Sequence, residues 1–228
     1  MIETMAALGG WMLRLVFRGI LLVRHPRPIH PHGVALAGHV RWLPGAVPAG
    51  IDWVDRPPAG NVQEAVARLS RSAGTPDPFP DVIGLAIRFD TPERPADLEL
   101  ASTGFGFPSR FWLAPHRSPS KARLTTLLPY RGATGPVLIA ARTIAPLGLP
   151  STLDDVAAKL DGAPWRLRLY HAGPRGPWHA FATVELAPVA GSRDSPLRFD
   201  ASRHLLPGAG MYRWVRQLRD PSYELVQD

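Results

Sequence analysis

Short apolar runs separated by proline and glycine make up most of this chain. The 26 prolines and 21 glycines fall in clusters that divide these runs into pieces of strand length, which is typical of strands joined by turns. In residues 165–170 arginines alternate with apolar residues, so each kind would occupy one face of a half-buried strand. The strands predicted in this way are 34–42, 84–89, 97–102, 110–113, 124–130, 137–142, 165–171 and 179–187.

Helical patterns are fewer. Residues 61–70 are predicted to begin as a helix, and Ser151 is a suitable N-cap before the acidic and apolar residues of 154–160. Asp220 and Pro221 have the N-cap and first-turn character of a last short helix. Residues 1–24 are predicted to form an N-terminal apolar helix, and 41–60 a long loop.

The order of these elements predicts the fold class. Eight strands that follow one another mostly as hairpins favour an α+β protein, mainly an antiparallel β-barrel with flanking helices. Closure into a barrel would also remove the exposed edges of the sheet. Because the 228 residues show no internal repeat and no linker, we expect one domain over residues 1–228.

The apolar segment 5–23 contains Arg14 and Arg18, which would lie one helical turn apart. Two arginines near the centre of a bilayer would oppose insertion by about 5–7 kcal/mol, and the features of a signal peptide are missing. We therefore expect this segment to dock on the barrel or to form a homo-oligomer. Contact with a membrane surface is the alternative.

Composition and charge exclude several classes. The chain has no cysteine, so it cannot build a disulfide, a thiolate nucleophile or an iron–sulfur cluster, and this fits a cytoplasmic protein. Its net charge is +7, and of its 26 basic residues only Lys121 and Lys159 are lysines. The arginines are spread rather than gathered in a basic run, so no nucleic-acid partner is expected. They predict a solvated basic surface or, alternatively, a pocket for an anionic ligand.

Four motifs occur in a fixed order in the first half of the chain. They resemble the N-terminal half of the catalase core over residues 27–103, and this resemblance implies the barrel architecture, a haem b cofactor and chemistry on peroxide. The motifs are His30-Pro31-His32-Gly33 followed by Gly38, Arg68-Leu69-Ser70-Arg71-Ser72-Ala73-Gly74, Asp81-Val82-Ile83-Gly84-Leu85-Ala86-Ile87-Arg88-Phe89, and Asp97-Leu98.

The resemblance also implies roles for single residues. His30 matches the distal histidine, which moves a proton between the two peroxide oxygens, as an imidazole can near neutral pH. Ser70 matches the serine that orients this histidine. His32 stands where the family has an arginine for a haem propionate, and the other candidates for binding haem in this half of the chain are Arg68, Arg88, Arg110 and Phe111.

One position departs from the family. Where catalases have an asparagine that polarises the peroxide, this chain has Ala101, followed by Ser102 as a shorter substitute. Without the amide donor, we expect at most weak catalase activity.

The C-terminal segment can be aligned with the family in two ways, which differ in whether it contains the iron ligand. Arg219 and Tyr223 have the spacing of the family's Arg-x-x-x-Tyr motif, in which the tyrosine binds the iron and the arginine favours its phenolate form. Alternatively, Phe199-Asp200, Pro207-Gly208 and Arg219-Asp220-Pro221 match an earlier segment of the family. On that alignment the chain ends before the haem-ligating helix.

Three functions follow from these observations. The first is a haem-dependent oxidoreductase of the catalase or peroxidase kind, acting on hydrogen peroxide, a hydroperoxide or a small organic substrate. The second is a haem-free descendant of the same barrel that serves in binding or assembly. The third takes His30, His32 and His39 as ligands of a non-haem metal, although no glutamate follows them closely.

Overall fold

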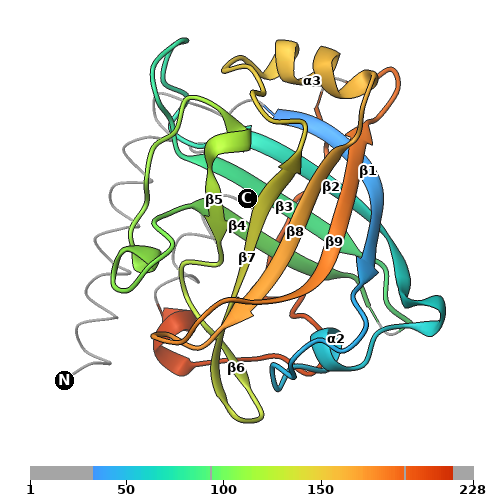
Figure 1. The fold of residues 1–228 in the computed structure, drawn as a ribbon, viewed down its shortest axis with the longest axis vertical. Helices are drawn as coiled ribbons and strands as arrows, with labels where there is room; N and C mark the ends of the chain where they lie inside the picture. Colours follow the sequence, from blue (N-terminus) through green and yellow to red (C-terminus); the bar gives the residue numbers. More distant parts are fainter. Residues whose placement is uncertain (1–32, 93, 193, 218–228) are drawn as a thin grey trace.

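The computed structural model describes residues 33–92, 94–192 and 194–217 (Figure 1). The predicted helices at 1–24 and after Asp220 therefore lie outside the described residues. The helical elements are short: α2 (Asp52–Asp55), α3 (Leu153–Asp161), and the 3-10 turns η1 (Ala59–Asn61), η2 (Ser109–Phe111) and η3 (Pro119–Lys121). The strands are β1 (Gly33–Trp42), β2 (Val62–Arg71), β3 (Ile83–Phe89), β4 (Ala96–Ser102), β5 (Arg123–Thr125), β6 (Tyr130–Gly132), β7 (Gly135–Ala145), β8 (Trp165–Ala172), β9 (His179–Pro188) and β10 (Gly210–Met211).

Eight of these strands close into an antiparallel barrel, as the strand order predicted. The ring runs β1-β2-β3-β4-β5-β7-β8-β9 and closes where β9 pairs with β1. In Figure 1, β7, β8 and β9 lie in front of β2, β3 and β4. The short strands β6 and β10 extend the edge of β7 outside the ring. None of the helices in the described part of the chain has the length and apolar character needed to cross a bilayer.

The largest correction concerns residues 61–70, which form strand β2 and not a helix. The segment is rich in helix-forming residues, but its pairing with β1 on one side and β3 on the other decides its structure. Ala65, Ala67 and Leu69 point into the core, while Val66 and Arg68 point outward. The period-two pattern is present, but its inward positions are mostly small.

Other boundaries also differ from the prediction. Residues 110–113 are not a strand, because η2 and the turn after it occupy this place, and the predicted strand 124–130 is divided between β5 and β6. The loop predicted at 41–60 contains the end of β1 and both α2 and η1. The N-cap of α3 is Thr152 and not Ser151, since the Thr152 hydroxyl accepts a hydrogen bond from the Asp155 backbone N–H.

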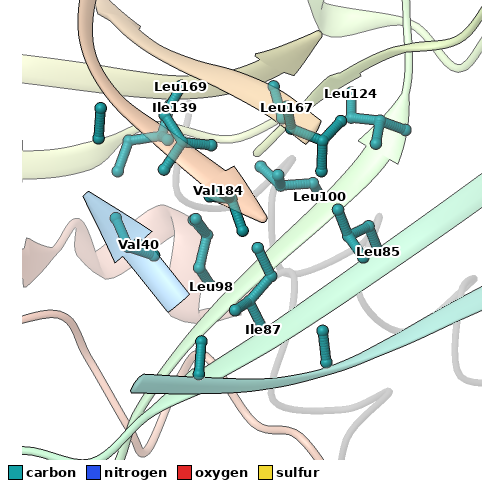
Figure 2. Packing of buried hydrophobic residues seen from close by; sticks show 14 of the residues in the cluster. Val40, Leu85, Ile87, Leu98, Leu100, Leu124, Ile139, Leu167, Leu169 and Val184 are labelled. Atoms are coloured by element: carbon teal, nitrogen blue, oxygen red, sulfur yellow. The ribbon is translucent and has the colours of Figure 1, made fainter. Parts of the chain in front are cut away.

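Aliphatic side chains fill the interior of the barrel, so it is a packed core (Figure 2). Each inward residue comes from an alternate position of its strand, such as Leu85 and Ile87 on β3 or Leu98 and Leu100 on β4. Any ligand site of the described residues must consequently lie on the outer face or at an end.

Different layers close the two ends of the barrel. At one end, Trp53 of α2 packs against the rings of Trp42, Phe89 and Phe181 at centroid distances of 4.8–5.7 Å. At the other end, α3 packs on β1 and β9 (Figure 1). Its Val156 and Leu160 are buried.

Gly38 allows β9 to approach β1 closely. A Cβ at this position would lie 1.8 Å from the carbonyl oxygen of Glu185, a backbone atom of the neighbouring strand. This contact explains the second glycine of the first motif by strand packing alone.

We predict that Gly38→Ala lowers the free energy of unfolding by about 1–3 kcal/mol, because the strands must separate to admit the methyl group. Denaturant unfolding measures the change. Gly106→Ala is the matched control, since no atom lies within 4 Å of a Cβ there. Equal stability of the two variants would contradict the close approach.

Candidate functional site

Three motif residues and Ala101 form one row across the outer face of β1–β4. Ser70 pairs with Gly33 on β1 and with Gly84 on β3, and Gly84 pairs with Ala101 on β4. The Ser70 side chain is buried, and its Oγ donates a hydrogen bond to the Gly84 carbonyl at 3.4 Å. The register thus brings the predicted active-site serine into the same row as the position that lacks the amide donor.

Arg68 lies beside this row and holds a carboxylate of the chain itself. Its Nε and Nη2 donate to the two carboxylate oxygens of Asp194 at 2.7 and 2.8 Å. A Cβ on Gly33 would lie 2.6 Å from the guanidinium carbon of Arg68. The glycine of the first motif therefore leaves room for the arginine of the second, and that arginine forms a bidentate ion pair with Asp194.

Arg88 makes a second bidentate pair, with the fully buried Asp97 of β4. The two distances are both 2.7 Å, and Nη2 of Arg88 also donates to the carbonyl of Arg198. The hydrogen bond with Asp97 raises the pKa of Arg88, against the opposing effect of its burial. The ring of Phe199 lies 5.2 Å from the guanidinium carbon of Arg88.

The segment after Phe199 completes this network. The backbone N–H of Asp200 donates to Oδ2 of Asp97 at 2.7 Å, and Nδ1 of His204 lies 2.9 Å from the same oxygen. Three separate sequence motifs, at Arg88, at Asp97 and at Phe199-Asp200, thus meet in one cluster on the outer wall.

Asp81 of the third motif also connects two motifs through hydrogen bonds. Its carboxylate accepts hydrogen bonds from the backbone N–H groups of Ala73 and Thr75, both at 2.9 Å. The residue is buried, and it fixes the turn that carries the end of the second motif.

Ser102 does not take the place of the missing asparagine. It points away from the row of Ser70 and Ala101, and its Oγ accepts from the Ile83 N–H at 2.9 Å and donates to the Ala114 carbonyl at 2.7 Å. Its hydrogen-bonding capacity is used in joining β4 to the loop that follows.

Phe111 lies in the loop that follows β4. It belongs to η2, where its ring contacts Phe107 edge to face at 6.4 Å. The neighbouring Arg110 donates to the carbonyls of Gly173 and Gly176 between β8 and β9. Phe111 thus has an aromatic partner in its own loop.

The remaining predicted site residues, His30, His32, Arg219 and Tyr223, lie outside the described residues. The predicted contact between His30 and Ser70 therefore stays a prediction. His39 is on the outer face of β1, with Nε2 4.0 Å from a carboxylate oxygen of Glu185. Over residues 33–217, apart from 93 and 193, no three histidine, aspartate or glutamate side chains are placed to hold a metal ion.

A second candidate site, which the sequence analysis missed, is the arginine row: Arg123 on β5, Arg142 on β7 and Arg168 on β8. These residues lie directly opposite one another on adjacent strands. Like charges in such cross-strand pairs repel one another and destabilise the sheet. Within the described residues, no carboxylate forms an ion pair with any of the three. The buried Nε of Arg168 has no hydrogen-bond partner among the described residues.

The ring of Phe105 lies against two members of the arginine row. The guanidinium carbons of Arg123 and Arg142 lie 5.9 and 5.3 Å from the centre of the Phe105 ring, in cation–π contact. Burial, and secondarily the charge of Arg123, lower the pKa of His116 in the same region. One signal could have revealed this face, since residues 100–153 contain no aspartate or glutamate. Their basic residues are Arg110, Arg117, Lys121, Arg123, Arg131 and Arg142.

Comparison of the sequence with protein-family models and with curated proteins finds no match.

The cluster at Asp97 generates a prediction. Replacing Asp97 by Asn should lower the free energy of unfolding by about 3–5 kcal/mol, because the largely buried guanidinium of Arg88 loses its counter-charge. Chemical denaturation measures this difference. Asp161→Asn, at an exposed position of α3, should change stability by less than about 0.5 kcal/mol. A loss at Asp97 as small as at Asp161 would show that the pair is not important for the fold.

Proposed function

We propose that this protein is a haem-free barrel of the catalase type that serves as a binding protein for an anionic partner. One observation carries the proposal: the described arginines that could receive haem propionates at the Ser70 row are already paired with carboxylates of the chain. Arg68 holds Asp194 and Arg88 holds Asp97, each through two hydrogen bonds. A propionate would have to displace one of them.

The positions of the other described candidates also disfavour haem. Phe111 packs edge to face on Phe107 of its own loop. Ala101 supplies no donor in the row, and the Ser102 hydroxyl is used elsewhere. The described residues therefore do not fit the cofactor, and no reaction step is assigned to it.

The catalase-type relationship has its own support. The glycine of the first motif leaves room for the arginine of the second, Asp81 fixes the turn of the second motif, and Arg88, Asp97 and Asp200 form one cluster. Motifs that are far apart in sequence thus contact one another in pairs. This is expected if the motifs were inherited together because their mutual contacts stabilise one barrel.

The binding role rests on the contrast between two groups of arginines. Arg68 and Arg88 are neutralised within the chain, whereas the arginine row has no acidic partner in the described part of the protein. An anion bound at the row would relieve the repulsion between adjacent guanidinium groups.

The Ser70 row supports a second candidate function. The alignment of Gly33, Ser70, Gly84 and Ala101 would allow His30 and Ser70 to act on a hydroperoxide, if Tyr223 held haem b. This enzyme would be a weak catalase, since Ala101 replaces the asparagine.

Titration of the purified protein with hemin distinguishes the two functions. We expect no saturable Soret band and no oxygen evolution from hydrogen peroxide, because the chain's own carboxylates occupy Arg68 and Arg88. A stoichiometric haem spectrum that is lost in Tyr223→Phe but kept in Tyr212→Phe would overturn the haem-free proposal. Increased peroxide turnover in Ala101→Asn would then support the enzyme.

A further inference from the structure

The loop 104–117 presents apolar side chains to the solvent. It lies on the outer face beside β7 and β8, since Phe105 packs edge to face on Tyr170 of β8 at 6.1 Å and makes its cation–π contact with Arg142 of β7. The large apolar residues at its outer side are highly exposed: Phe107 at 53%, Trp112 at 64% and Leu113 at 53%. Three such residues within seven positions are more than the isolated apolar side chains that every surface carries.

The loop is held firmly to the barrel. Arg110 is buried, donates to the carbonyls of Gly173 and Gly176 at 3.0 and 3.1 Å, and lies 4.7 Å above the ring of Trp178. The Trp178 ring stacks on Phe105 at 4.8 Å and donates its Nε1–H to the Phe105 carbonyl at 2.7 Å. The loop that carries the exposed side chains is thus anchored to the barrel, so binding of a partner would need little ordering of its backbone.

Basic residues surround the exposed side chains. The guanidinium carbon of Arg175 lies 4.9 Å from the centre of the Phe107 ring, and Arg117 is exposed four positions after Leu113. The arginine row lies on the same face, and residues 100–153 contain no acidic residue. An exposed apolar tip within a basic surface is complementary to lipid tails beneath anionic headgroups.

We propose that the loop 104–117 docks this protein on an anionic phospholipid bilayer. Phe107, Trp112 and Leu113 enter the interface between headgroups and acyl chains, while Arg117 and Arg175 contact lipid phosphates. The arginine row, farther from the bilayer, adds electrostatic attraction to the anionic headgroups. This inference rests on the proposed binding role and names its partner.

A lipid surface fits better than a nucleic acid. Phe105 and Trp178 are stacked on each other and covered by arginines, so they offer no free face for a base. Leu113, an aliphatic residue with no stacking surface, is half exposed beside Trp112.

Sedimentation with vesicles tests the proposal on the full chain. We expect binding to vesicles of phosphatidylcholine mixed with phosphatidylglycerol, and about tenfold weaker binding to phosphatidylcholine alone. The double variants Trp112→Ser with Leu113→Ser, and Arg117→Glu with Arg175→Glu, should each lose about tenfold or more of this binding.

Matched controls use exposed positions outside the loop. Leu147→Ser with Val47→Ser also replaces two exposed apolar residues by serine, and Arg56→Glu with Arg94→Glu reverses two exposed arginine charges. Both should bind anionic vesicles like the wild type. Circular dichroism checks that every variant is folded.

The inference would be overturned by no binding to anionic vesicles, or by an equal loss of binding in the loop variants and the controls. It would also be overturned if the loop variants bind vesicles like the wild type, a result that would assign the membrane binding to the segment 5–23. Binding of a single-stranded oligonucleotide in place of vesicles would assign the face to nucleic acid. None of these results alters the hemin titration, so the haem-free proposal stands or fails separately.

Discussion

The buried carboxylate of Asp97 is the constraint on which the outer wall of this barrel depends. A charged group away from water is tolerated only if donors surround it, and Asp97 accepts hydrogen bonds from Arg88 and from the Asp200 N–H, with Nδ1 of His204 2.9 Å away. These donors come from β3 and from the segment after β9, far apart in sequence. Satisfying one carboxylate therefore fixes this segment against β3 and β4.

The same requirement divides the arginines of the chain into two groups. Arg68 and Arg88 point outward from β2 and β3 and are neutralised by bidentate carboxylates, so they serve the structure. Arg123, Arg142 and Arg168 point outward from β5, β7 and β8 and stand together without acidic partners in the described chain. Attraction for an external anion belongs to the second group, and the exposed apolar loop adjoins it.

Much of the fold could be predicted because the burial of most strands is visible in their pattern of apolar and polar residues. Alternation in β8 and the apolar runs of β3, β4, β7 and β9 gave these strands within one to three residues at each end. Strand β2 could not be found in this way, because its inward positions are mostly alanine and its remaining residues favour helices. The apolar residues at 110–113 resemble a strand, but this segment forms the 3-10 turn η2, and its Trp112 and Leu113 are exposed.

The candidate sites were predictable only in part. Motif order alone selected Ser70, Arg68 and Arg88, but their partners Asp194 and Asp97 depend on register and on a loop beyond β9. The arginine row is invisible along the chain, because its three members lie 19 and 26 positions apart and meet only through strand pairing. The absence of acidic residues over 100–153 was the one local signal of that face.

A double-mutant cycle between Arg88 and Asp97 tests the central claim, that these motif residues form an internal ion pair and not a receptor for an anionic cofactor. The free energies of unfolding of Arg88→Gln, Asp97→Asn and the double variant give the coupling between the two side chains. We predict a favourable coupling of about 1–3 kcal/mol. Effects that add to within about 0.5 kcal/mol would contradict it, because independent residues would leave the Arg88 guanidinium available to a ligand.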